Sequence, residues 1–257
     1  MEGEKFYRNI QKALEDLPEN YSILEEQIDI EIQMKYFEYS KKMREKKNPE
    51  ECFEKRDELF EKSTTKERKK EILTTIAVFD DVKAYRTLEK FVGQTTGELK
   101  QWGILALQES RMLLQTSLLD EQQVFISTGL GGKGKKLRYF VVFLNKDNDE
   151  LLTRSQQKLL KNELIFQLKK QDGEFESMDF TEGFSSALVM LPLNVEIKSV
   201  FQSIIDECNQ YGGFLNEDLL VTNVKILSRS EIIQIINHKP EDQIDEEDDD
   251  ELDEEED

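Results

Sequence analysis

The spacing of apolar residues divides the chain into a helical first part and a mixed second part. Up to residue 119, apolar side chains recur three or four positions apart, which is the period of one helix face. Leu99, Trp102 and Leu105 follow this spacing in the last of these segments. Residues 28–36 alternate in the manner of a strand, but they fit a helical stripe equally well, and we predict a helix there.

Local start signals support the helices of this first part. Asn48 precedes a proline in the first turn of a helix, where the missing N–H costs nothing. Asp81 precedes a helix that begins at residue 82, and Thr95 with Glu98 has the spacing of a capping box.

From residue 122 the pattern predicts strands and helices in turn. Two runs rich in β-branched and aromatic residues, 122–128 and 137–144, flank a glycine-rich stretch and predict a hairpin. The elements predicted next are a helix over 155–171, strands over 174–180 and 185–193, a helix over 195–210, a strand over 219–227 and a helix over 231–238. The signals that bound these helices are Thr153 with Gln156, Asn194, Gly212 with Gly213, and Ser228 with Glu231.

From Leu137 the predicted order is β-α-β-β-α-β, which is that of the ferredoxin-like arrangement, with one added strand in front. We therefore predict an α+β protein with an all-α domain over 1–119, a ferredoxin-like domain over 120–239 and an acidic tail over 240–257. The tail repels itself and cannot bury apolar surface, so it is predicted to be disordered.

Two of the predicted helices, within 80–111, share a pattern in which an apolar–lysine pair leads a spaced apolar face. The matching residues are Val82, Lys83 and Leu88 in the first helix and Leu99, Lys100, Gly103 and Leu107 in the second. The pattern resembles the helices of HEAT-like repeats, and this resemblance implies a short helical stack that presents a binding surface. An ordinary helical bundle is the alternative.

Charge is distributed unevenly along the chain. The sequence is 37% hydrophobic and 35% charged, and its formal net charge is −20. Residues 241–257 hold 14 acids and no base, so the other 240 residues carry −6. Such a tail projects a negative field that speeds encounters with basic partners and weakens with salt. Solubility alone is the alternative interpretation.

Nothing in the sequence predicts secretion or membrane insertion. The N-terminus is charged throughout, and no apolar run approaches the roughly 18 residues needed to span a bilayer. Cys52 and Cys208 lie far apart, so we expect no disulfide or zinc site and predict that both are core thiols. We predict a cytoplasmic protein without a membrane partner.

The stretch STGLGGKGKK, residues 127–136, is the candidate anion-binding site. Successive glycine N–H groups can form an anion-binding nest, and lysines add a positive field. The candidate residues are Gly129, Gly131, Gly132, Lys133, Gly134, Lys135 and Lys136. A Walker A loop is not predicted, because Lys136 stands at the Ser/Thr position and a strand follows where a helix is required. A flexible hairpin tip is the alternative.

Residues 136–143, KLRYFVVF, match part of the RNA-binding strand of an RRM, at Lys136, Phe140, Val141 and Phe143. Phe140 and Phe143 are three positions apart, so they face opposite sides of a strand, and we predict core packing for this run. The net acidic body also argues against direct nucleic-acid binding, which depends on Lys and Arg neutralising phosphates.

Catalytic groups are scarce. The only histidine, His238, is predicted to end a helix, where a cap or solvated role is expected. No acid/base pair stands out among the many carboxylates. The sequence therefore predicts a protein that is not an enzyme and has no catalytic residue, metal or cofactor.

These features together predict a non-enzymatic adaptor whose acidic tail steers a basic partner, such as a ribosomal or nucleic-acid-associated protein. The alternative is a regulatory domain that captures a phosphorylated ligand or an RNA phosphate at residues 129–136. The sequence makes no prediction of the oligomeric state.

Overall fold

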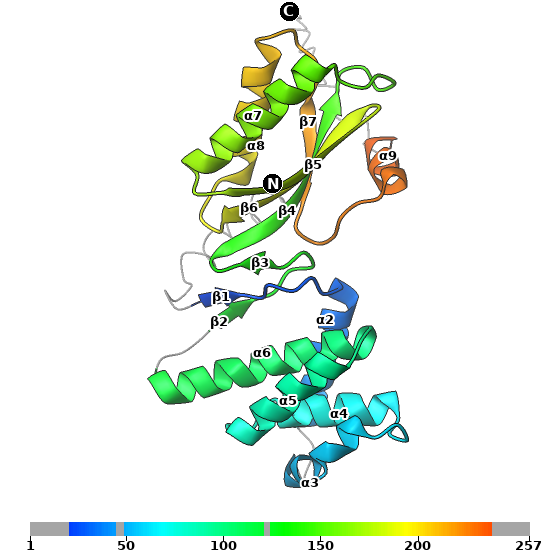
Figure 1. Ribbon diagram of the computed structural model, residues 1–257, viewed down its shortest axis with the longest axis vertical. Helices are drawn as coiled ribbons and strands as arrows, with labels where there is room; N and C mark the ends of the chain where they lie inside the picture. Colours follow the sequence, from blue (N-terminus) through cyan, green and yellow to red (C-terminus); the bar gives the residue numbers. More distant parts are fainter. Residues whose placement is uncertain (1–20, 45–48, 121–123, 238–257) are drawn as a thin grey trace, which may run out of the picture. The chain divides into compact units, whose positions relative to one another are not determined.

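The computed structural model describes residues 21–44, 49–120 and 124–237, which form a mixed helix and sheet structure (Figure 1). Residues up to Ile226 belong to one compact unit and residues from Leu227 to a second. The predicted boundary at residues 119 and 120 lies inside the first unit and stays a prediction. The acidic tail and His238 lie outside the described residues.

The helices are α2 (Ile30–Arg44), α3 (Pro49–Glu54), the 3-10 helix η1 (Arg56–Phe60), α4 (Lys66–Ile76), α5 (Val82–Gln94), α6 (Glu98–Leu119), α7 (Arg154–Lys170), α8 (Ile197–Asn209) and α9 (Arg229–Asn237). The strands are β1 (Tyr21–Ile23), β2 (Val124–Ile126), β3 (Gly132–Lys133), β4 (Lys136–Asn145), β5 (Glu174–Thr181), β6 (Phe184–Pro192) and β7 (Leu215–Thr222). No described helix is long and apolar enough to cross a membrane.

Helices α2 to α6 share one apolar core that includes a buried polar group. The Tyr36 side chain is fully buried and packs edge-on against Trp102, with 5.4 Å between ring centroids. Its hydroxyl donates a hydrogen bond of 2.6 Å to the Glu109 carboxylate, which also pairs with Arg44. Burial and the neighbouring carboxylate raise the Tyr36 pKa well above its usual value. This bonded carboxylate joins α2 to α6, as buried polar groups require partners.

The prediction of an all-α first part is wrong in one respect, because Tyr21–Ile23 is a strand. It pairs in parallel with β2, and the Leu24 N–H extends the ladder by donating to the Ile126 carbonyl at 2.9 Å. The backbone groups of Tyr21–Ile23 find partners about 100 residues away in sequence, and no local pattern reveals such a pairing. The helix predicted over 28–36 is present and begins at Ile30.

The larger sheet is antiparallel, with the order β7-β4-β6-β5, and β3 adds two residues beside the start of β4. The hairpin predicted between 122–128 and 137–144 is wrong, since β2 pairs with β1. The partner of β4 there is β3, within the predicted loop: Gly132 lies opposite Leu137 and Lys133 opposite Lys136. The strand that precedes the predicted ferredoxin-like order is therefore β3, which is shorter than the predicted strand over 122–128 and lies further along the sequence.

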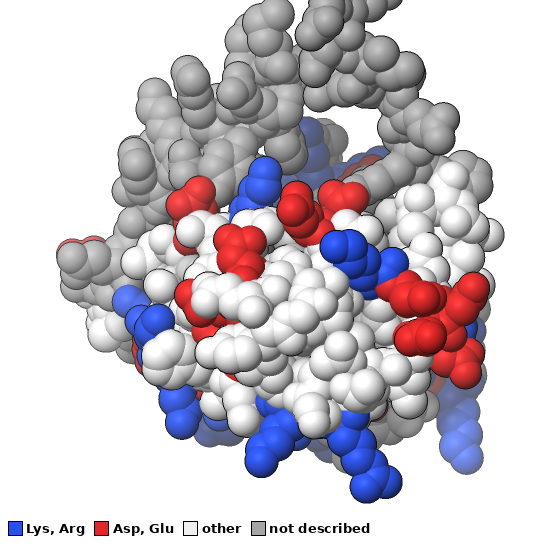
Figure 2. Space-filling view, turned by 90° about the horizontal axis from the view of Figure 1, so that it is seen from above, with Lys and Arg blue, Asp and Glu red and all other residues white. Residues whose placement is uncertain are grey.

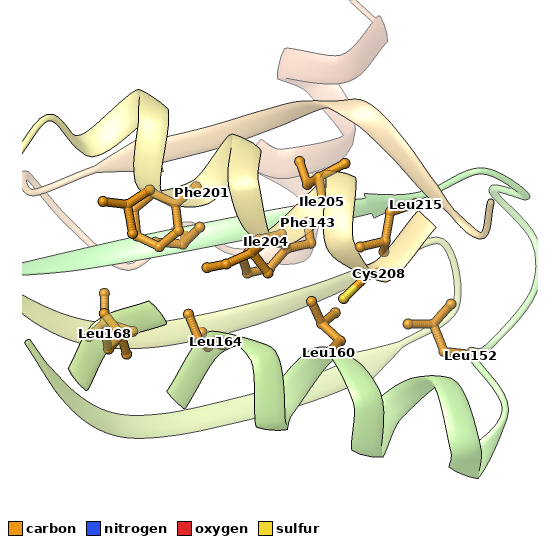
Figure 3. Packing of buried hydrophobic residues seen from close by; sticks show 14 of the residues in the cluster. Phe143, Leu152, Leu160, Leu164, Leu168, Phe201, Ile204, Ile205, Cys208 and Leu215 are labelled. Atoms are coloured by element: carbon orange, nitrogen blue, oxygen red, sulfur yellow. The ribbon is translucent and has the colours of Figure 1, made fainter. Parts of the chain in front are cut away.

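Helices α7 and α8 pack on this sheet through a second apolar core (Figure 3). Alternate residues of β4, Val141 and Phe143, are fully buried in it, and Phe143 meets Phe201 of α8 with 6.1 Å between ring centroids. Leu160 and Leu164 contribute the buried face of α7. The core packing predicted for residues 136–143 is confirmed, since Phe140, Val141 and Phe143 are all buried.

The predicted helix starts are correct where a side chain reaches the first turn. Thr153 with Gln156 forms a capping box, Ser228 and Glu231 bond each other's backbone N–H, and Asp81 caps α5. Two predicted caps are wrong, Thr95 for α6 and Asn194 for α8. Helix α6 begins after Gly97, whose φ of 66° makes the turn without a side-chain cap, and α8 begins after Glu196. Asn48 lies outside the described residues.

The two cysteines differ in their surroundings. Cys208 is fully buried in the core between α7 and α8, as predicted, whereas Cys52 is only half-buried. Burial raises the pKa of the Cys208 thiol to about 12, and Glu163 and Glu207 add to the effect.

We expect one fast and one slow thiol in the folded protein. At pH 8, about four units below its pKa, roughly one Cys208 in ten thousand is a thiolate, and the core also excludes the reagent. Titration with an aromatic disulfide reagent should modify Cys52 first, and Cys52→Ala should remove the fast phase. Equal rates for both thiols would show that the core opens readily.

Candidate anion-binding surfaces

The glycine–lysine loop, residues 129–136, has a buried half and an exposed half. Residues 129–132 are buried, whereas Lys133, Gly134 and Lys135 are exposed. Gly134 takes a φ of 60° at the turn from β3 to β4, where an L side chain would be strained. The structure therefore places Gly129, Gly131 and Gly132 where the loop packs against other backbone segments, and Lys133, Gly134 and Lys135 at a solvent-exposed turn.

The buried glycines are required by close contacts between backbones. A Cβ on Gly129 would overlap the Val224 carbonyl oxygen, and a Cβ on Gly131 would lie 2.6 Å from the carbonyl oxygen of Glu25. Gly131 also has a φ of 67°, and its N–H donates to the Thr128 carbonyl at 3.2 Å. These glycines hold the loop against the segments after β1 and after β7. Packing alone accounts for them.

The lysines of the loop lie beside acidic residues of β5 and the turn before it. The Lys136 ammonium bonds Glu174 at 3.0 Å and Asp172 at 3.3 Å. This pairing raises the pKa of Lys136, and the same contact lowers the pKa of Glu174. Lys135 lies over the ring of Tyr21, with its Nζ 5.2 Å from the centroid. The two carboxylates therefore offset the charge of Lys136.

Another hollow, of about 390 Å³, lies beside the start of α7. It is lined by charges of both signs, Lys146 against Asp147 and Glu150. Buried Asn145 contributes to its wall by donating a 2.8 Å hydrogen bond to the Glu150 carbonyl, which holds together the two ends of the segment 145–150.

Figure 2 shows a face on which acidic and basic side chains surround a broad uncharged area. Within the described ranges, no three His, Cys, Asp or Glu side chains are grouped to hold a metal ion.

A more basic hollow lies between η1 and α5 and has a volume of about 320 Å³. We call it the basic groove. Its lining residues are Arg56, Asp57, Phe60, Val82, Lys83, Arg86, Thr87 and Lys90. Four of the eight are basic and one is acidic, in a chain whose net charge is −20. This excess of basic over acidic lining residues distinguishes the basic groove from the hollow beside α7, where charges of both signs line the wall.

Aromatic rings support two of the four cations. The Arg56 guanidinium lies 4.8 Å from the centroid of Phe53, and the Lys90 ammonium lies 4.6 Å from that of Phe60. Such contacts orient a cation without neutralising it. Arg86 is paired with Glu89 at 2.7 Å, whereas among the described residues no carboxylate forms an ion pair with Arg56, Lys83 or Lys90. These three cations carry the charge that an anion can use.

The sequence held one signal for this groove. Lys83, Arg86 and Lys90 stand at positions i, i+3 and i+7, so they share one face of a helix. The HEAT-like pattern instead predicts that Val82 faces a neighbouring helix, and Val82 is 61% exposed. The contribution of Arg56 depends on the packing of η1 beside α5, which no local pattern predicts.

Comparison with known proteins defines no family for the chain. No protein-family model matches it, and no curated protein does. Among solved structures, one described as "a putative transposase" from Deinococcus radiodurans R1 is similar to part of it, with 17% identity and a TM-score of 0.34. The match covers 40% of this chain and 89% of the other.

This comparison corrects one prediction. The sequence predicted that the protein is not an enzyme, and that prediction is wrong against a similar structure whose description names an enzyme. Absence of enzymatic activity is accordingly no part of the function proposed below. A TM-score of 0.34 also transfers no transposase activity to this chain.

Replacing Gly129 tests whether the loop needs its close backbone contact with Val224. We expect Gly129→Ala to lower the free energy of unfolding by at least about 2 kcal/mol, because the Val224 backbone must move. The measurement is urea unfolding followed by the fluorescence of Trp102, the only tryptophan. Gly93→Ala is the matched control: a Cβ there meets nothing within 4 Å, and alanine should leave stability unchanged or raise it by up to about 1 kcal/mol. Equal effects of both substitutions would contradict this account of the loop.

Proposed function

We propose that this protein is a docking protein whose basic groove binds an acidic segment of a protein partner. The single observation that carries the proposal is the excess of basic side chains around one hollow of an acidic chain. An extended acidic peptide suits this site, because Lys83 and Lys90 are about two turns apart along α5, with Arg56 on η1, and can meet separate carboxylates.

The groove also offers apolar contact area. Phe60 and Thr87 are half-buried in its lining, and Val82 is exposed. A bound segment would cover these groups while its carboxylates meet the cations at the rim. Rim charges add modest energy each and mainly accelerate association, so the binding we propose is salt-dependent and exchangeable.

The finer architecture is part of the proposal. We infer that residues 136–222 are a ferredoxin-like unit, which is supported by the element order β4-α7-β5-β6-α8-β7 and the antiparallel strand order β7-β4-β6-β5. We infer a short HEAT-like stack for α4 to α6, supported by the packing of α6 against both α4 and α5. A helical stack that presents a binding groove is the usual way such units act.

The acidic segment, residues 241–257, completes the proposed adaptor. Its 14 acids support recruitment of a basic partner, such as a ribosomal or nucleic-acid-associated protein. Cytoplasmic placement stays a prediction from the sequence. Capture of a phosphorylated ligand by the glycine–lysine loop is the second candidate, and exposed Lys133 and Lys135 beside Gly134 favour it.

Charge reversal in the groove tests the proposal. We expect Lys83→Glu with Lys90→Glu to weaken binding of a fluorescent oligo-glutamate peptide by about tenfold or more, measured by anisotropy at low salt. Lys133→Glu with Lys135→Glu changes the net charge equally and serves as the control, with an expected loss below about threefold. An equal loss in both variants would mean that net charge, and not the groove, governs binding. A larger loss in the control would favour the loop.

A further inference from the structure

Three cations of the basic groove form no ion pair with a described carboxylate, and two of these three lie on aromatic rings. We infer that the groove recognises a phosphorylated serine or threonine side chain within the partner's acidic segment, with Arg56, Lys83 and Lys90 as the groups that bind the phosphate. This inference rests on the proposed function of the groove. It adds the chemical group that is bound and the means by which docking is switched on.

The Arg56 guanidinium is positioned by two contacts with Phe53. Its Nη1 donates a 2.9 Å hydrogen bond to the Phe53 carbonyl, and the group lies over the Phe53 ring, which is itself stacked on Phe79 with 4.9 Å between centroids. Within the described ranges the guanidinium makes no other hydrogen bond, so Nε and Nη2 are left to donate to a ligand. Arg138 uses this same edge to hold the Glu176 carboxylate. Two parallel N–H groups of this kind match the oxygens of a phosphate.

Lys90 is supported in a similar way. Its ammonium lies 4.6 Å from the centroid of Phe60, and Phe60 meets Phe91 edge-on with 6.3 Å between centroids. Phe91 is buried in the core of the helical part, so the ring beneath Lys90 is tied to that core. The ring positions the ammonium without neutralising its charge. Lys83 adds an exposed cation on the same face of α5, about two turns away.

The charge of the lining matches that of a phosphate group. Arg86 pairs with Glu89 at 2.7 Å, which leaves three basic residues of the lining for a ligand. Asp57 is the one acid among the lining residues, so three positive charges and one negative charge leave a net charge of +2. A phosphorylated side chain carries roughly −1.5 to −2 at neutral pH and has three acceptor oxygens. A carboxylate has one charge and two oxygens, so it satisfies this set of cations less completely.

The volume of the basic groove favours recognition of one modified side chain. At about 320 Å³ it is at the lower end of the range for small-ligand sites, which is roughly 300–1,000 Å³. A hollow of this size holds one or two side chains, and the rest of the segment lies outside it. The strong interactions are therefore made by the group that enters, and a dianion gains more from the three cations than a carboxylate does. Phosphorylation of the partner then switches docking on.

Peptides that differ at one position test which group is recognised. The probe is a fluorescent acidic peptide whose central residue is serine, glutamate or phosphoserine, and binding is measured by anisotropy at low salt. We expect the phosphoserine peptide to bind about tenfold more tightly than the glutamate peptide, and the serine peptide to bind most weakly. Equal affinity of the phosphoserine and glutamate peptides, still lost in Lys83→Glu with Lys90→Glu, supports the proposed function and overturns the inference. Binding of all three peptides that ignores these substitutions overturns both.

Charge-conserving substitutions test the role of the arginine. Arg56→Lys keeps the positive charge but removes the paired N–H groups, so we expect the preference for phosphoserine over glutamate to fall from about tenfold to below about threefold. The glutamate peptide should still bind this variant within about twofold of the natural chain, which shows that the groove is folded. Arg86→Lys is the matched control, because this arginine lies in the same lining but pairs with Glu89, and it should leave the preference unchanged.

Three results of these measurements overturn the inference. The first is an equal loss of preference in Arg56→Lys and Arg86→Lys, and the second is full preference in Arg56→Lys. The third is a loss of preference confined to Lys133→Glu with Lys135→Glu, which would place the phosphate on the glycine–lysine loop.

Competition with inorganic phosphate separates a docked side chain from a free anion. We expect unlabelled phosphoserine peptide to displace the probe at a concentration at least about tenfold below that of inorganic phosphate, because the segment adds contacts at the rim of the groove. Equal potency of the two competitors overturns the inference, since the partner's segment would then contribute nothing to binding.

Discussion

The structure depends on one crossing of backbones, at Gly129–Gly132. There the chain passes Val224 and Glu25 so closely that side chains beyond hydrogen do not fit at Gly129 and Gly131. The Leu130 N–H donates to the Asn223 carbonyl at 3.0 Å, and Arg138 donates to the Leu130 carbonyl at 2.7 Å. The crossing joins the segment after β1 to the end of β7, and it sets the register of β3 against β4.

This crossing also decides where an anion can bind. A glycine-rich loop holds phosphate only if its N–H groups are open to solvent, and here residues 129–132 are buried. The following lysine, Lys136, then lies against Glu174 and Asp172. Lys136 is therefore offset by carboxylates, whereas Arg56, Lys83 and Lys90 of the basic groove form no ion pair with a described carboxylate.

Local signals predicted most elements but not their long-range partners. Apolar spacing and side-chain caps such as Thr153 and Asp81 located the helices, because both act within one or two turns. The pairing of β1 with β2 was missed since its two strands are about 100 residues apart. Thr95 was a misleading cap, because the positive φ of Gly97 starts α6 beyond its reach. Sequence spacing could have identified the basic face of α5, but not Arg56 beside it.

The rigid position of α5 supports the proposed docking role of the groove. Helix α5 is fixed on its inner face by Ala84, Leu88 and Phe91, and Gly103 of α6 permits close approach, since a Cβ there would lie 3.0 Å from Val92. The backbone that carries Lys83, Arg86 and Lys90 is therefore fixed before binding, so the ordering cost in the groove is limited to their side chains. An extended acidic peptide must instead lose conformational entropy when it binds. That cost lowers the affinity expected of the proposed site, and a modest affinity is what exchange of one acidic peptide for another requires.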